Sequence, residues 1–161
     1  MEIIGRLLGN GARVKIMRLF FLNKNKGFLN KEIVKRSRVN PDVVRHELSL
    51  LSAVGFIKKK GSAWFFDASF KYALEFENLL INADTLDKEA IVNNFKKVGR
   101  VKLLVIAGVF IKNKESRVEL LIVGDRMKKS KIDEGVRRLE AEIGAELTYA
   151  IFDTKEFIYR I

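Results

Sequence analysis

A short run of residues around the single proline constrains the fold of this 161-residue chain more than any other feature. Asn40 can cap a helix, Pro41 suits the first helical position because its missing N–H needs no partner there, and Asp42 complements the helix dipole. Apolar residues then recur at helical spacing until a glycine ends the pattern, at Val44, Leu48, Leu51 and Gly55. The sequence therefore predicts a helix over residues 41–53 with one apolar face.

The segments on either side of this helix predict two further helices and a β-hairpin. Residues 11–22 carry apolar side chains at helical spacing, and Asn30 is a candidate N-cap for a short helix over residues 31–36. Residues 56–60 and 63–66 have the composition of strands and are separated by the tight turn Gly61-Ser62. We expect a helix, a short helix, the helix over 41–53, and then a hairpin with a basic tip.

Positive charge is concentrated in the same part of the chain. Residues 1–67 contain 14 Lys and Arg against five Asp and Glu, a net charge of +9, whereas the other 94 residues contain 17 against 15, a net charge of +2. A surface charged only for solubility would carry its excess more evenly. We interpret the imbalance as the mark of a polyanionic partner, with nucleic acid favoured.

Residues 10–67 resemble the winged helix-turn-helix domain of arsenic-repressor-like and multidrug-repressor-like regulators. The resemblance depends on the stretch from Asn40 to Leu51, on Val54-Gly55-Phe56-Ile57, and on the lysine-rich hairpin. It implies that the helix over 41–53 is a recognition helix and that the hairpin is a wing. It also implies a transcriptional regulator that binds double-stranded DNA.

The physical argument assigns roles to individual residues. An α-helix fits the major groove, and hairpin lysines can lie along the flanking phosphates. Arg45 is the leading candidate for a base-edge contact because its guanidinium can pair with guanine; Ser49 and His46 are lesser candidates, and a histidine on a helix is as often without such a role. The triple lysine has an alternative as a charged edge strand that prevents aggregation. The remaining candidates for contact with DNA are Asn30, Lys31, Asn40, Asp42, Lys58, Lys59, Lys60 and Ser62.

Two amphipathic helices are predicted in the middle of the chain, over residues 70–81 and 86–98. Phe76, Leu79 and Leu80 form a stripe that either joins two chains or packs on the chain's own domains. A homodimer would suit paired half-sites on DNA, and we expect one.

The C-terminal part predicts a small mixed sheet covered by helices. Residues 100–111 and 118–125 are strand-like and joined by a short polar loop, which makes them antiparallel. Ser130 begins a candidate capping box for a helix that ends at Gly144; a third strand over 146–152 and a last turn capped by Thr154 follow. The predicted fold class is α+β, with domains at 1–67 and 98–161 and a helical connector at 68–97.

Residues 98–161 resemble the core of the minimal nucleotidyltransferases. The resemblance depends on Gly108, on the strand that ends Leu-Leu-Ile-Val-Gly-Asp, and on the following helix and strand. That family holds a triphosphate with Gly-Ser and binds two magnesium ions with two carboxylates, two residues apart on one strand face.

The chain departs from that pattern where the chemistry is done. Val109 stands at the serine position, and Arg117 stands at the first carboxylate position, so that only Glu119 remains acidic. A guanidinium about 4 Å from a dication would be repelled by roughly 8 kcal/mol at an effective dielectric constant near 20. We therefore expect no metal site, no catalytic residue and no cofactor. Gly108, Arg117 and Glu119 are a possible ligand-binding remnant; Arg117 either attracts an anion or pairs with Glu115 or Glu119.

The leading hypothesis is a non-enzymatic, sequence-specific DNA-binding regulator with a degenerate nucleotidyltransferase-like domain for regulation or assembly. One alternative is an active nucleotidyltransferase that acts on a nucleic acid or a protein. Another is an antitoxin-like adaptor that binds a second protein through the C-terminal domain.

The amino-acid composition excludes several classes of site and of protein. The chain contains no cysteine and one histidine, which excludes disulfides and thiolate or His/Cys metal sites. No apolar run reaches the roughly 18 residues that span a bilayer, and residues 1–5 lack a signal-peptide core. We expect a cytoplasmic protein without a membrane partner.

Overall fold

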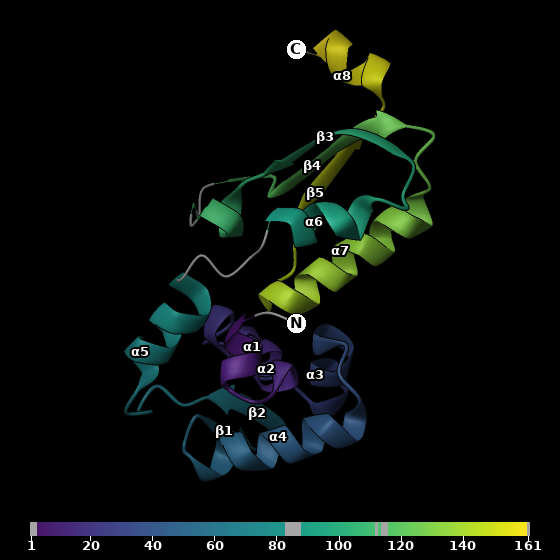
Figure 1. Ribbon diagram of the computed structural model, residues 1–161. Helices are drawn as coiled ribbons and strands as arrows, with labels where there is room; N and C mark the ends of the chain where they lie inside the picture. Colours follow the sequence, from purple (N-terminus) through teal and green to yellow (C-terminus); the bar gives the residue numbers. More distant parts are fainter. Residues whose placement is uncertain (1–2, 83–87, 112, 114–115, 161) are drawn as a thin grey trace. The chain divides into compact units, whose positions relative to one another are not determined.

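The computed structural model describes residues 3–82, 88–111, 113 and 116–160 (Figure 1). Its internal contacts divide the chain into two compact units. The first unit comprises residues 1–85 and 140–145, and the second comprises residues 86–139 and 146–161. Each unit combines helices with a small sheet, so the mixed helical and strand content agrees with the prediction.

The first unit contains a group of helices, a hairpin and a short helical segment (Figure 1). In chain order these are α1 (Ile3–Leu7), α2 (Gly11–Leu22), α3 (Asn30–Ser37), α4 (Pro41–Ala53), β1 (Ile57–Lys60), β2 (Ala63–Phe66), α5 (Ala73–Glu77) and the π-helical turn η1 (Asn78–Asn82).

Helix α2 supports the rest of the first unit. Every residue from Ile16 to Phe21 is buried, because α3, α4 and β2 all pack on this helix. The Phe20 ring meets Phe28 and Phe56 edge-on, with centroids 5.7 and 6.5 Å apart. Aromatic pairs in this arrangement contribute about 0.5–1.5 kcal/mol beyond the area they bury. Helices α3 and α4 are therefore arranged around a rigid apolar support.

One buried residue of α2 is charged. Arg18 is only 2% exposed; its Nε donates to the carbonyl oxygen of Leu80 at 2.9 Å and its Nη1 donates to that of Glu142 at 3.1 Å. Carbonyl groups near helix ends lack intrahelical donors, so the guanidinium satisfies acceptors that would otherwise be unpaired. This cation belongs to the core of the unit.

The hairpin is fixed to the helices by backbone bonds. Strands β1 and β2 are antiparallel, with Ile57 opposite Phe66 and Lys60 opposite Ala63. Trp64 on β2 also pairs with Phe28 through two backbone hydrogen bonds of 2.9 Å. This bridge joins the hairpin to the segment that leads into α3.

The second unit is built around a three-stranded sheet (Figure 1). Its order is β3-β4-β5; β3 and β4 are antiparallel and β4 and β5 are parallel, as expected of a mixed sheet. Tyr149 donates its hydroxyl to Asp133 at 2.8 Å and so ties β5 to α7. The elements are α6 (Lys88–Phe95), β3 (Arg100–Ile106), the 3-10 turn η2 (Gly108–Ile111), β4 (Leu120–Asp125), α7 (Lys129–Ile143, whose last residues belong to the first unit), β5 (Tyr149–Phe152) and α8 (Thr154–Arg160).

Three predicted helix caps are wrong. Helix α3 begins at Asn30 itself, and the carboxylate of Glu32 accepts the N–H of Leu29 at 2.7 Å. Ser130 lies inside α7, which begins at Lys129. At α8 the carboxylate of Asp153 accepts the N–H of Glu156 at 2.8 Å, so Thr154 is the first helical residue. At α8 the Asp153 carboxylate supplies the acceptor that the sequence assigns to the Thr154 hydroxyl, whereas at α3 the Glu32 carboxylate bonds back to the residue that precedes the helix.

Several predicted elements are shorter than expected. The strand predicted over 100–111 ends at Ile106, because Gly108 adopts a φ of +60° and the chain turns into η2. The helix predicted over 70–81 is split between α5 and η1, and the one predicted over 86–98 is described as α6. The segment between these two predicted helices, residues 82–85, lies largely outside the described residues. Among the described residues, no helix is both long and apolar enough to cross a bilayer.

Candidate nucleic-acid interface

Helix α4 begins as its sequence predicts. The side chain of Asn40 accepts the N–H of Asp42 at 2.9 Å, and Pro41 occupies the first turn. The cap satisfies one of the donors that every helix start leaves unpaired, and such a cap is worth about 1 kcal/mol. The position at which α4 begins is thus set by its own sequence.

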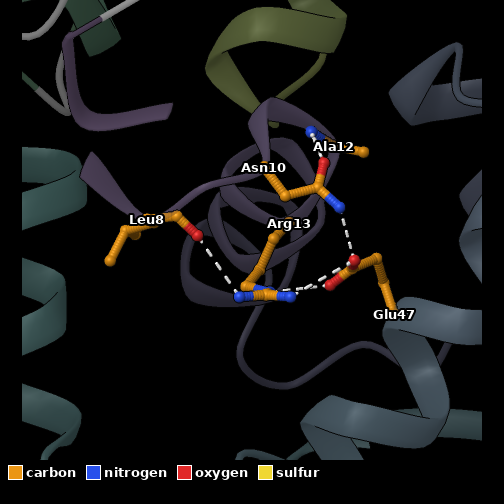
Figure 2. A network of polar contacts seen from close by, with 5 residues as sticks. All are labelled: Leu8, Asn10, Ala12, Arg13 and Glu47. Carbon is orange, nitrogen blue, oxygen red and sulfur yellow. Dashed lines mark hydrogen bonds and ion pairs between the residues drawn. The ribbon is translucent and has the colours of Figure 1, made fainter. Parts of the chain in front are cut away.

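A polar network fixes α4 against α2 (Figure 2). The Glu47 carboxylate accepts from Arg13 Nε at 2.8 Å and from Asn10 Nδ2 at 2.5 Å, and Arg13 Nη1 donates to the carbonyl oxygen of Leu8 at 3.3 Å. Asn10 also caps α2 by accepting the N–H of Ala12 at 2.9 Å. One carboxylate on α4 is therefore bonded to the beginning of α2.

Because Glu47 is buried, this network fixes the rotation of α4 about its own axis. The side chain of Glu47 is 1% exposed, whereas that of Arg13 is 26% exposed. A buried carboxylate without partners is strongly unfavourable, so a rotation of α4 that separated Glu47 from Arg13 would be opposed. Together with the buried residues Val44, Leu48 and Leu51, the network determines which face of α4 remains open.

The open face of α4 carries the polar residues that the sequence singles out. Arg45, His46 and Ser49 are all exposed. Arg45 forms an ion pair with Asp42 one turn earlier, and both side chains are more than two-thirds exposed. An exposed pair of this kind contributes little, typically below about 1 kcal/mol, so the guanidinium can exchange Asp42 for another acceptor at small cost.

A concave surface lies beside this face. The cavity has a volume of about 490 Å³ and is lined by residues from α3, α4 and β2. Trp64 Nε1 donates to Asn30 Oδ1 at 2.8 Å, which connects the start of α3 to the hairpin across the cavity wall. The lining residues are Asn30, Arg45, Leu48, Ser49, Ser52, Ala53 and Trp64.

The hairpin presents its three lysines outward. Lys59 lies over the Trp64 ring at 5.5 Å from its centroid, and Lys60 lies over the Phe65 ring at 5.7 Å. Lys58 is paired with Asp67 at 3.0 Å, and hydrogen bonds from Lys58 and from Ser69 lower the pKa of Asp67 to about 2. Asp67 therefore remains ionised and holds Lys58 at the base of the hairpin.

All eleven residues predicted to contact DNA are exposed. The structure brings Asn30, Arg45 and Ser49 together around one cavity. The others occupy three neighbouring places: the start of α3, the exposed turns of α4 and the hairpin. They are Lys31; Asn40, Asp42 and His46; and Lys58, Lys59, Lys60 and Ser62.

Sequence reasoning misses Glu47 and Trp64. Glu47 follows Val44 by three residues and precedes Leu51 by four, so it lies on the apolar face, and that position was the available signal. Trp64 is half-buried in β2 and also lines the cavity. Arg13 and Arg18 add to the basic count of this segment although their charges serve the fold.

The residues of the possible remnant in the second unit are only partly together. Glu119 Oε2 accepts the N–H of Thr148 at 3.0 Å, and Oε1 accepts that of Val109 at 3.4 Å. A Cβ at Gly108 would lie 2.4 Å from Glu119 Cγ, so Glu119 fills the space beside this glycine. Arg117 is exposed and, among the described residues, forms no ion pair with Glu119; Glu115 lies outside the described residues.

Comparisons with models of known protein families, with curated proteins and with solved structures find no match to this chain.

Proposed function

We propose that the first unit binds double-stranded DNA through α4 and the β1–β2 hairpin, and that the protein is a transcriptional regulator. The observation that carries the proposal is the geometry of α4. Glu47 and the apolar residues fix the inner face of this helix, while Arg45, His46 and Ser49 remain exposed beside a cavity. A fixed helix with an open polar face suits the major groove, where base edges present donors and acceptors.

The surrounding charges support the same proposal. Lys31 lies at the start of α3, and Lys58, Lys59 and Lys60 lie on the hairpin. The start of α3 lies beside the hairpin, because Trp64 donates to Asn30, so these ammonium groups can neutralise neighbouring phosphates along the groove that α4 enters. Asn30, Asn40, Asp42 and Ser62 complete the proposed contacts.

For the second unit we propose a regulatory or assembly role without nucleotidyl transfer. Both oxygens of Glu119 accept backbone N–H groups, and a basic residue, Arg117, stands at the position of the partner carboxylate. This arrangement supports a structural use of Glu119. Incubation with ATP and magnesium should label neither a nucleic acid nor a protein, and labelling that Glu119→Gln abolishes would contradict this part of the proposal.

The proposal is tested by binding of a fluorescently labelled duplex at several salt concentrations. Each phosphate contact contributes about 0.9 to the slope of log K against log salt. Replacing Lys58, Lys59 and Lys60 together by Ala should reduce the slope by roughly 2–3. Arg45→Ala should lower affinity for the preferred sequence by about 1–3 kcal/mol and leave the slope nearly unchanged.

A matched control distinguishes binding at this interface from non-specific attraction of DNA to any positive charge on the chain. Replacing Lys96, Lys97 and Arg137 by Ala removes three exposed cations from the second unit. We expect that variant to keep the slope and affinity of the wild-type protein. Equal losses in the two triple variants, or the absence of salt-sensitive binding, would refute the proposal.

Trp64 supplies an independent readout. It is the only tryptophan, and it lines the cavity beside α4. Binding of duplex at this cavity should change its emission with the same midpoint as the anisotropy. An unchanged emission during saturable binding would place the DNA elsewhere.

The proposal extends to a homodimer that contacts two half-sites. Of the predicted stripe, Leu80 is buried in the first unit's core, whereas Leu79 is 42% exposed and the neighbouring Leu74 is 67% exposed. These two leucines support self-association. Light scattering of the wild type should give twice the chain mass, and Leu74→Ser with Leu79→Ser should give the monomer.

A further inference from the structure

A second polar cavity lies within the second unit, at one end of its sheet. Its volume is about 740 Å³, and its lining comes from the start of β3, the end of β4 and the beginning of α8. Strand register places it away from Gly108 and Glu119, because Arg100 is opposite Asp125 whereas Ile106 is opposite Leu120 at the far end. The lining residues are Arg100, Lys102, Asp125, Arg126, Thr154 and Lys155.

The backbone around this cavity is closely packed. A Cβ at Gly124 would lie 2.3 Å from the carbonyl oxygen of Arg100, and one at Gly99 would lie 2.7 Å from that of Arg126. These two glycines allow the start of β3 to lie against the end of β4. Arg126 has a φ of +53°, a left-handed conformation that is unfavourable for a residue with a Cβ. Strained residues of this kind are concentrated at binding sites.

The charge of the lining is strongly positive. Four of the six side chains are cationic and one, Asp125, is acidic. Lys102 Nζ lies 2.8 Å from Asp125 Oδ2, and this hydrogen bond is the largest cause that lowers the pKa of Asp125 to about 2. In the described part of the chain, Arg100, Arg126 and Lys155 form no ion pair. Three cations therefore face one cavity without a carboxylate of their own.

We propose that this cavity binds a small anion with two or more phosphate groups. A guanidinium group can donate two parallel hydrogen bonds to a phosphate, whereas an ammonium group acts as a point charge. The lining of the cavity provides both kinds of contact. The volume lies in the range that holds small ligands. None of the six lining residues is aromatic, so the recognition is of the phosphates and not of a stacked base. Asp125 orients Lys102 and limits the charge that the site accepts.

Calorimetric titration of the full chain with inorganic diphosphate and with tripolyphosphate, in low-salt buffer without magnesium, tests this proposal. Both should bind at one site per chain and more tightly than orthophosphate. Arg126→Gly should weaken binding about tenfold, since it removes a charge-assisted contact. This variant is also expected to fold, because glycine adopts a positive φ without strain.

Two further variants make the result decisive. Asp125→Asn should tighten binding several-fold, because it removes the repelling carboxylate and releases Lys102. Arg137→Gln removes one exposed cation from α7, outside the cavity, and should change the affinity less than about twofold. No saturable heat with the wild type, or an equal loss in Arg126→Gly and Arg137→Gln, would overturn the proposal.

Duplex DNA provides the last comparison. The proposal for the first unit is independent of this cavity, so Arg126→Gly should leave duplex binding unchanged, and a short duplex should not displace diphosphate. Displacement by the duplex, accompanied by weaker duplex binding in Arg126→Gly, would assign the cavity to a nucleic-acid surface and overturn the proposal of a small anion.

Discussion

The polar network around Glu47 holds α4 against α2, and we predict that its loss destabilises the first unit. In Glu47→Ala, Arg13 and Asn10 lose their shared acceptor, and a cavity replaces a carboxylate that is 1% exposed. Removing one partner of a fully buried ion pair costs about 3–5 kcal/mol. Because Arg13 is 26% exposed and can rehydrate, we expect a lower cost, about 2–3 kcal/mol. For a unit of this size the melting temperature should fall by roughly 10–20 °C.

Urea unfolding followed by Trp64 emission measures this effect on the first unit, which contains the only tryptophan. A double-mutant cycle with Arg13→Ala should give a coupling of about 1–2 kcal/mol. Glu75→Ala, an exposed carboxylate on α5, is the matched control and should change stability by less than about 0.5 kcal/mol. Additive effects of Glu47→Ala and Arg13→Ala, or a loss as small as that of the control, would show that this ion pair does not hold α4 on α2.

Two further predictions concern the cap at the start of α4 and the ion pair at the base of the hairpin. Asn40→Ala should destabilise the first unit by about 1 kcal/mol, since the N–H of Asp42 loses its cap, whereas Asn40→Asp should restore most of the loss in the same urea assay. The pKa of Asp67 is lowered to about 2, so its ion pair with Lys58 stabilises the fold above the unfolded pKa near 4 and is lost as pH falls through 2. Asp67→Asn should therefore be less stable than wild type at pH 7 and nearly equal to it at pH 2, and an equal difference at both values would contradict this assignment.

Much of the first unit is predictable because its signals are local. The bounds of α2 and α4 and the pairing of β1 with β2 follow from periodicity, caps and the turn at Gly61. The network of Asn10, Arg13 and Glu47 joins residues 34 or more positions apart, and helical spacing places Glu47 on the buried face without naming its partner.

The less predictable parts depend on tertiary geometry. The cavity beside α4 requires Trp64 to be bridged to Phe28, a pairing across 36 residues that composition does not indicate. The cationic cavity of the second unit depends on strand register, which brings Arg100 opposite Asp125. The caps predicted at α3 and α8 are each displaced by one residue, because only the backbone path decides whether a polar residue precedes a helix or is its first residue.

Amide chemical-shift mapping of the isotope-labelled chain, titrated with a short duplex, shows whether α4 and the hairpin contact DNA. We predict that the shifts concentrate on Asn30, Arg45, Ser49, the β1–β2 hairpin and the indole N–H of Trp64. Shifts confined to the second unit, or an unperturbed α4 at saturating duplex, would contradict it.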